Sequence, residues 1–269
     1  MRALLECVVN LSEGRRGDVL GRLAAAAGSG LLDVHSDRHH HRSVLTLGGP
    51  EVEDAVRAVS VLAVDEIDLT VHAGVHPRMG AVDVVPFVPL GETELPEAVE
   101  ARDRFVAWAG KELELPCFVY GPERTLPELR RLAFRELIPA SGPSSPHPTA
   151  GATAVGARTP LVAYNLWLTD PDPALARALA TELRSPAVRA LGLEVGGYTQ
   201  VSCNLIDPLA VGPAAVFDAV ARRARVERAE LVGLVPDAVL DGVPVHRWTE
   251  LDLDRERTIE ARLEAAGIR

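Results

Sequence analysis

The sequence predicts an α/β (α+β) fold of two subdomains, each a βαββαβ-like sheet covered by helices, with a substrate cleft between them. Two observations carry this prediction. Apolar residues alternate at period two in some segments and recur at helical spacing in others, and the order strand, helix, strand, strand, helix, strand occurs twice. The 269 residues, 47% of them hydrophobic, suffice for two small domains. We expect subdomains at 1–158 and 159–245 and a charged helical tail at 246–269.

The first copy of the pattern occupies the amino-terminal part of the chain. Strands are predicted at 3–9, 31–35, 43–47 and 67–71, and helices at 15–27 and 51–63. In the first helix Val19, Leu20 and Leu23 stand at helical spacing, and glycines at 28–30 end it. Val52, Val56 and other apolar residues line one face of the second helix.

An extension at 73–158 separates the copies. It is predicted to hold strands at 82–88 and 117–120, helices at 96–113 and 126–135, and a long Pro/Ser/Gly-rich loop at 139–151. The second copy then follows, with strands at 161–168, 193–195, 200–206 and 229–235 and helices at 173–183 and 213–224. Pro213 suits the first turn of its helix.

Composition excludes several classes of function. A formal net charge of −10 argues against nucleic acid and anionic membrane surfaces as partners. The three cysteines lie too far apart for a CxxC motif, and no apolar run approaches the roughly 20 residues of a membrane span. The amino terminus lacks the apolar core of a signal peptide, so a cytoplasmic protein is expected, and a homodimer is compatible with the sequence.

One stretch, HAGVHPRMGAVDVVPFVP at 72–89, concentrates chemically active residues. His72 and His76 stand four apart, but Gly74 and Pro77 oppose a helix. We therefore predict a tight loop at 76–80 that leads into a strand, a setting in which binding and catalytic groups are common. From the chemistry alone, His76 is equally well explained as a titrating catalytic group and as a hydrogen-bonding group of the turn.

The same stretch resembles the central signature of the glutamate formiminotransferase family. Five further blocks resemble that family in the same order: ECVVNLSEG at 6–14, HHRSVLTLGG at 40–49, GPSSPHPTAGATAVGAR at 142–158, TQVSCNLID at 199–207 and ELVGLVP at 230–236. The resemblance implies transfer of the formimino group of N-formimino-L-glutamate to tetrahydrofolate as co-substrate, with His76 as the acid/base. It implies small-molecule partners and no metal.

The resemblance also suggests binding residues. The substrate-binding candidates are Asn10, Glu13, Asp33, His40, Arg42, Arg78 and Arg158, and the folate-binding candidates are Gly142, Pro143, His147, Pro148, Gly151 and Ala152. Because the substrates are anions and the protein is acidic, local arginines must supply the attraction. An alternative interpretation makes the 10–13 segment a helix-capping turn, and another makes the glycine-rich loop a linker.

The sequence departs from the family pattern at several positions. Val9 and Leu11 replace a usual proline and phenylalanine, His41 replaces an asparagine, and Ala140-Ser141 replace an aspartate-phenylalanine pair ahead of the proposed folate loop. Three other functions stay open: a metal-dependent amidine hydrolase that uses the histidines, an enzyme with Cys7 as nucleophile, and a folate- or amino-acid-binding protein without catalysis.

Overall fold

The computed structural model describes residues 3–74 and 77–268. The chain divides into two compact units, Met1–Thr159 and Pro160–Arg269. Each unit has its own sheet and its own hydrophobic core. The predicted fold class is confirmed, because both sheets are covered by helices and each contains the βαββαβ order.

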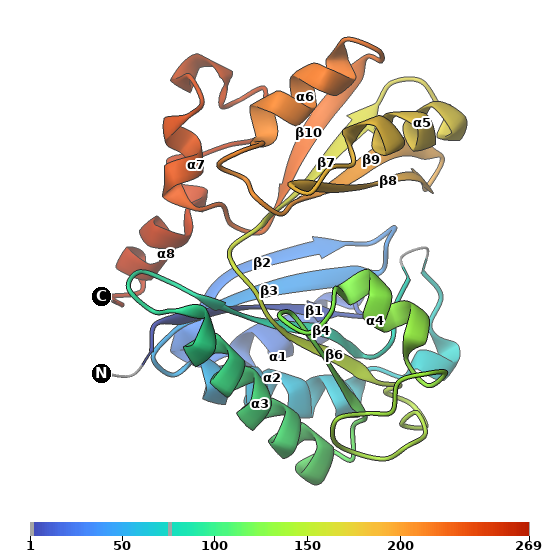
Figure 1. Ribbon diagram of the computed structural model, residues 1–269, viewed down its shortest axis with the longest axis vertical. Helices are drawn as coiled ribbons and strands as arrows, with labels where there is room; N and C mark the ends of the chain where they lie inside the picture. Colours follow the sequence, from blue (N-terminus) through green and yellow to red (C-terminus); the bar gives the residue numbers. More distant parts are fainter. Residues whose placement is uncertain (1–2, 75–76, 269) are drawn as a thin grey trace. The chain divides into compact units, whose positions relative to one another are not determined.

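Unit 1 is built on a six-stranded mixed sheet. Its strands are β1 (Leu5–Leu11), β2 (Leu31–Asp37), β3 (Arg42–Gly49), β4 (Val82–Pro89), β5 (Cys117–Tyr120) and β6 (Thr153–Ala157). They lie in the order β2-β3-β1-β4-β6-β5 (Figure 1). β1 runs antiparallel to both β3 and β4, whereas β6 runs parallel to β4 and β5.

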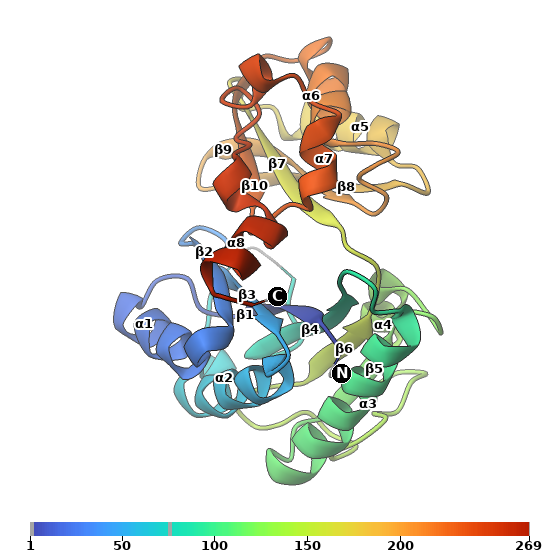
Figure 2. The same cartoon turned by 90° about the vertical axis from the view of Figure 1, so that its left-hand side faces the viewer.

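Helices lie on both faces of this sheet. The helices α1 (Gly17–Ala26), α2 (Val52–Glu66) and α3 (Leu95–Glu112) cover one face (Figure 2). Alternate residues of β1, including Cys7, Val9 and Leu11, point into the core beneath them. The helix α4 (Leu126–Leu132) packs on the other face, where Leu129 contacts the group formed by Phe118 and Ala154. Residues such as Asn10 therefore point to the face that carries α4.

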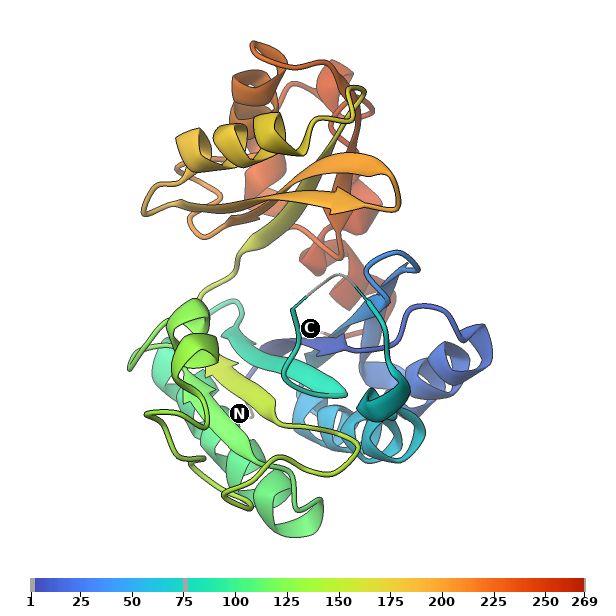
Figure 3. The ribbon, with the colours of Figure 1, turned by 90° about the vertical axis from the view of Figure 1, so that its right-hand side faces the viewer.

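Unit 2 is built on a four-stranded antiparallel sheet. Its strands β7 (Val162–Leu168), β8 (Val188–Val195), β9 (Tyr198–Leu205) and β10 (Val226–Val232) lie in the order β10-β7-β9-β8. The helices α5 (Pro173–Leu183) and α6 (Pro213–Ala221) share one core with this sheet, and α5 lies along the β8–β9 hairpin (Figure 3). The short helices α7 (Asp237–Asp241) and α8 (Ile259–Ala265) follow.

One predicted strand is wrong, and one strand was missed. Residues 67–71 form no strand: the Asp68 side chain accepts a hydrogen bond from the Thr70 N–H and starts a 3-10 turn at Leu69–Val71. The fourth strand of the first copy is instead β4. The strand β6 was missed, because its short run of small residues reads as part of the glycine-rich loop.

The carboxy-terminal tail also differs from the predicted helix. In the described part of this tail, up to residue 268, only Ile259–Ala265 is α-helical, with 3-10 turns at Val245–Arg247 and Arg255–Arg257. The helix is broken where Asp252 adopts a positive φ of 52° and Asp254 caps the second turn. None of the described helices is both long enough and apolar enough to cross a membrane.

Candidate active site

Polar side chains gather at one edge of the unit 1 sheet, meaning the side where strands begin or end and not an outer strand. β1 and β2 end at this edge, while the oppositely directed β3 and β4 begin there. Asn10 near the end of β1 pairs with Val44 and Val84 in register, and Asp37 at the end of β2 pairs with Arg42. The parallel strands β5 and β6 also begin at this edge. The sheet topology thus brings several of the predicted site residues together.

A buried carboxylate, Asp83, connects two arginines at this edge. Asp83 is 2% exposed, and its Oδ1 accepts a hydrogen bond of 2.7 Å from the Met79 N–H. Its Oδ2 lies 2.6 Å from Arg130 Nη2 and 3.8 Å from Arg42 Nη1. Arg42 also donates to the Asn10 side-chain oxygen. Two guanidinium groups share one carboxylate, so this group of residues carries a net positive charge.

The electrostatic environment of Arg42 suits anion binding. Burial lowers the pKa of Arg42 to about 10, with Asp83 opposing the shift and with Arg130 and Arg78 adding to it. Arg42 is therefore still a cation at neutral pH, but it is poorly solvated and close to other cations. An anionic group placed beside it would gain a strong charge-assisted hydrogen bond.

The turn between β2 and β3 holds the chain on either side of residues 75 and 76. The Arg78 guanidinium donates to the carbonyl oxygens of His40 (3.1 Å) and His41 (3.3 Å) and lies 2.8 Å from His72 Nε2. Gly74 packs so tightly on this turn that an added Cβ would lie 2.7 Å from the His40 oxygen. His76 itself lies outside the described residues, and its catalytic role stays a prediction.

Several predicted binding residues stabilise the local structure. Glu13 is 1% exposed, and its Oε1 accepts hydrogen bonds from the backbone N–H groups of Gly14, Arg15 and Arg16. Burial raises its pKa, but these bonds and the Arg16 guanidinium outweigh burial and lower it. Glu13 thus stabilises the turn that follows β1, and we treat it as a positioning residue. It does not cap the helix α1, whose N-cap residue Arg16 has no side-chain cap hydrogen bond.

A second acid, the partly exposed Asp37, fixes the turn at His40. The Asp37 carboxylate accepts hydrogen bonds from the backbone N–H groups of His39 and His40, and its Oδ2 lies 2.9 Å from His40 Nδ1. Burial opposes the ionisation of Asp37, but its contacts with His40 outweigh burial and hold the pKa of Asp37 well below the usual range. The imidazole of His40 is therefore oriented by Asp37.

The candidate folate-binding loop contacts Met79 and Gly80, at the carboxy-terminal end of the 76–80 segment. Gly80 forms a bridge with Gly151, and Ala152 donates its N–H to the Met79 oxygen at 2.9 Å. A Cβ on Gly80 would lie 2.1 Å from the Ala152 oxygen, so only glycine allows this approach. His147 Nδ1 accepts the Ala150 N–H at 3.0 Å and so closes its own turn, whereas Gly142, Pro143 and Pro148 are exposed.

Two predicted residues lie apart from the edge. Asp33 precedes Asp37 by four residues on β2 and pairs with Thr46 in register. Arg158 follows the carboxy-terminal end of β6, whereas the site lies at the end of the sheet where β6 begins. The Arg158 guanidinium donates to the Thr159 oxygen. Two residues that were not predicted, Asp83 and Arg130, lie within the group instead. A charged residue at the start of the otherwise apolar strand DVVPFV was the available signal for Asp83.

The structure disfavours Cys7 as a nucleophile. Burial is the main cause that raises the pKa of the Cys7 thiol well above its usual value, which disfavours a reactive thiolate. Within residues 3–74 and 77–268 no three histidine, cysteine or acidic side chains are grouped as metal ligands.

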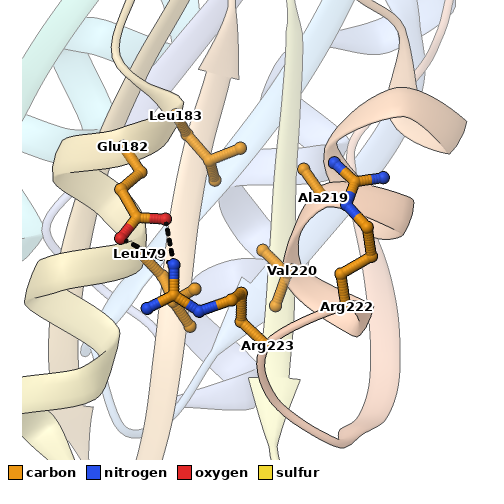
Figure 4. Close-up of a pocket in the computed structure, with 7 residues that line it drawn as sticks. All are labelled: Leu179, Glu182, Leu183, Ala219, Val220, Arg222 and Arg223. Carbon is orange, nitrogen blue, oxygen red and sulfur yellow. Dashed lines mark hydrogen bonds and ion pairs between the residues drawn. The ribbon is translucent and has the colours of Figure 1, made fainter.

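Unit 2 carries a surface pocket of its own. It encloses about 340 Å³ between α5 and α6, and its lining includes Leu179, Leu183 and Val220 (Figure 4). Arg223 Nη1 donates to both carboxylate oxygens of Glu182 at its rim, at 3.0 and 2.9 Å. This ion pair lies on the surface, and nothing in the pocket indicates a ligand.

The comparison with known proteins places this edge in a family. Residues 4–158, which include the whole Asp83 group, match the formiminotransferase domain, N-terminal subdomain. The chain belongs to the formiminotransferase family. It is 34% identical to the glutamate formimidoyltransferase of Streptococcus pyogenes over 96% of this chain and 98% of that protein. It is 31% identical to the glutamate formimidoyltransferase of Thermoplasma acidophilum over 98% of this chain and 99% of that protein.

A longer relative shares the same region. The formimidoyltransferase-cyclodeaminase of Gallus gallus is 37% identical over the full chain, which spans 57% of that protein. The family membership that the sequence blocks suggested is confirmed. In this formiminotransferase, the six-stranded sheet carries the candidate active site at the edge where β3 and β4 begin.

The His41 ring at this formiminotransferase site is expected to make stability depend on pH. His41 Nδ1 accepts the Gly14 N–H at 3.1 Å, and its ring stacks on His72 with centroids 4.0 Å apart, so the ring is neutral. Burial and then His72 lower its pKa to about 4, against an opposing effect of Glu13. In the unfolded chain the ring takes up a proton near pH 6.5. Stability is therefore full above pH 6.5 and falls between about 6.5 and 4.

The exchange that tests this pH dependence of stability is His41→Asn. Asparagine tolerates the positive φ of 50° at this position and does not titrate. Urea unfolding at pH 8 and pH 5 should show that the variant loses about 2 kcal/mol less stability than the parent protein. His39→Asn, at an exposed position of the same turn, is the control and should leave the loss in place. An equal loss in the His41 variant contradicts this assignment.

Proposed function

We propose that this protein transfers the formimino group of N-formimino-L-glutamate to tetrahydrofolate, giving 5-formiminotetrahydrofolate and glutamate. The observation that carries the proposal is the positive group around Asp83, which adjoins the 76–80 segment in a member of the formiminotransferase family. The proposed donor carries carboxylates, which Arg42 and Arg130 are suited to bind. The three cysteines are free and buried, which favours a reducing cytoplasm as the compartment.

The chemistry requires two proton transfers. The N5 amine of tetrahydrofolate attacks the amidine carbon of the donor, forms a C–N bond and loses a proton. The bond from this carbon to the glutamate nitrogen then breaks, and that nitrogen gains a proton. One group with a pKa near 7 can accept the first proton and donate the second, and we assign both steps to His76. Holding the two substrates together supplies a further part of the rate.

The binding roles follow from the geometry of the edge. We propose that Arg42 binds a carboxylate of the donor, with Asn10 orienting its guanidinium. Arg78 and His40 hold the turn beside it. We propose that tetrahydrofolate contacts the loop of Gly142, Pro143, His147, Pro148, Gly151 and Ala152, whose exposed part offers glycine and proline backbone.

The function is tested by incubating the protein with N-formimino-L-glutamate and tetrahydrofolate and measuring 5-formiminotetrahydrofolate. The expected result is glutamate release that requires tetrahydrofolate and matches the folate product mole for mole. Glutamate release without tetrahydrofolate would instead identify an amidine hydrolase. Binding of both compounds without product would identify a binding protein.

Replacing Arg42 by lysine is expected to raise the KM for the formimino donor roughly tenfold, equivalent to about 1.4 kcal/mol of binding. Lysine keeps the charge but cannot form two parallel hydrogen bonds to a carboxylate. The turnover number should change much less, because this contact is equal in the ground and transition states. Steady-state kinetics measure both quantities.

The matched control is Arg104→Lys. Arg104 is half-exposed and binds Glu53 away from the edge, so this exchange should leave the KM unchanged. A normal KM in the Arg42 variant would remove Arg42 from the donor site and would leave Arg78 and Arg130 as the carboxylate-binding arginines.

A further inference from the structure

Two of the sequence blocks that mark the family play no part in the site on unit 1. The block at 199–207 lies mainly on β9, and the block at 230–236 begins on β10. These strands flank β7, so residues 30 apart in the sequence are brought to the same face of one sheet. Gln200, Ser202 and Asn204 of the first block and Glu230 of the second point to this face.

The helices of unit 2 pack on the other face of its sheet. Tyr164, Leu166, Val201 and Leu231 share a core with α5, α6 and α7. Because side chains alternate along a strand, their neighbours point the opposite way. That opposite face carries polar and aromatic residues: Asn165, Trp167, Gln200, Ser202, Arg228 and Glu230.

Most of these side chains are held by one another. Glu230 Oε2 accepts hydrogen bonds from Asn165 Nδ2 at 3.1 Å and from Trp167 Nε1 at 2.8 Å. The Arg228 guanidinium lies over the Trp167 ring, 4.3 Å from its centroid. Asn165 and Trp167 are thereby fixed in place by a carboxylate and a cation on the neighbouring strand.

Gln200 is the exception. It pairs with Trp167 in register and is 0% exposed. Neither its amide nitrogen nor its amide oxygen has a hydrogen-bond partner among the described residues. Buried polar side chains are nearly always paired, and an unpaired one costs stability. A buried amide that presents both an unused donor and an unused acceptor therefore indicates a missing partner.

We propose that Gln200 binds the pterin ring of tetrahydrofolate through its carboxamide, with Trp167 and Asn165 fixed beside it by Glu230. A pterin has an N–H donor and a C=O acceptor side by side on its pyrimidine ring. A carboxamide has one acceptor and one NH₂ donor, so the two groups can form a pair of complementary hydrogen bonds. This inference rests on the proposed function, which supplies tetrahydrofolate as the substrate.

The chemistry favours the pterin over the other parts of the substrates. The carboxylates of glutamate and of the folate tail accept hydrogen bonds and donate none, so they would leave the Gln200 oxygen unpaired. Carboxylates are also bound best by cations such as arginine, not by a neutral amide. A neutral amide is instead suited to a neutral ring edge, and failure to pair a buried group discriminates strongly between ligands.

The test uses Gln200→Met, which keeps the side-chain length and removes both polar atoms. The dissociation constants of tetrahydrofolate and of 6-methyltetrahydropterin, which lacks the benzoylglutamate tail, are measured calorimetrically under anaerobic conditions. Both should rise at least tenfold and by the same factor. The Tm of the ligand-free variant should be no lower than that of the parent protein, because the exchange removes an unpaired buried group. The KM for N-formimino-L-glutamate should stay within about twofold, since a uniform binding contact affects only its own ligand.

The matched control is Asn204→Met, an amide-to-thioether exchange at an exposed position on the same strand and face. It should leave both dissociation constants unchanged. Unaltered pterin affinity in the Gln200 variant overturns the proposal, and so does a loss confined to tetrahydrofolate with its tail. Because binding is measured without turnover, a protein that binds pterins but transfers no formimino group would refute the proposed function and leave this inference standing.

Discussion

Replacing His76 by alanine is expected to lower the kcat of formimino transfer by about 10²–10⁴-fold, the range attached to one positioned acid/base group. The amine of tetrahydrofolate must lose a proton as it attacks, and the departing glutamate nitrogen must gain one. Without the imidazole both transfers depend on water. The KM values for the two substrates should change little, because the group acts on the transition state.

The measurement is steady-state transfer with both substrates saturating, alongside urea unfolding of the variant. His39→Ala, at an exposed position of the turn between β2 and β3, is the control and should retain the parent kcat. If the His76 variant kept more than about a tenth of the parent rate while remaining folded, another group would be the acid/base. His72 would then be examined next, because its ring lies against His41 and the Arg78 guanidinium.

Hydrophobic periodicity predicted most of the fold. The long amphipathic segments became α2 and α3, and the alternating segments became strands of two sheets. It failed where local polar contacts or small residues decide the structure, as at the Asp68 turn and in β6. Hydrophobic periodicity also could not predict the strand order, because β1 pairs with β3 and β4, which are distant from it in the sequence.

The candidate site was predicted in outline. The sequence blocks contained Asn10, Arg42 and Arg78, and the sheet brings these residues to one edge. The partner of Asp83 was not predictable, because Arg130 is 47 residues away, on the helix α4. Glu13 could equally have been a ligand or a helix cap, and only its three backbone hydrogen bonds show that it stabilises the turn after β1.

Asp83→Asn is expected to lower the free energy of unfolding by about 3 kcal/mol, as when one member of a buried ion pair is removed. Asparagine is nearly the same size and can still accept the Met79 N–H. It cannot neutralise Arg130 or Arg42, which lie 2.6 and 3.8 Å from the Asp83 Oδ2. Two poorly solvated cations then repel each other at the edge where the donor is proposed to bind.

The Asp83→Asn exchange lowers stability, but it is expected to strengthen the binding of anions. Removing the carboxylate raises the charge of the group, so added glutamate should stabilise the variant more than it stabilises the parent protein. The kcat should still fall, because the Asp83 carboxylate holds Met79, three residues after His76, at 2.7 Å. Urea unfolding with and without 100 mM glutamate, together with transfer kinetics, separates the two effects.

Two further variants decide whether the Asp83 carboxylate acts through its arginines. Asp103→Asn removes an acid that is 58% exposed and lies 2.8 Å from Arg102, and it should cost less than about 1 kcal/mol, as surface ion pairs do. In the double variant Asp83→Asn/Arg130→Met the repelling cation is gone, so the combined loss should be smaller than the sum of the single losses by about 1–3 kcal/mol. Strictly additive losses would mean that Asp83 and Arg130 act independently. In that case Asp83 would serve only to hold the Met79 N–H, and the positive group would not be a single binding unit.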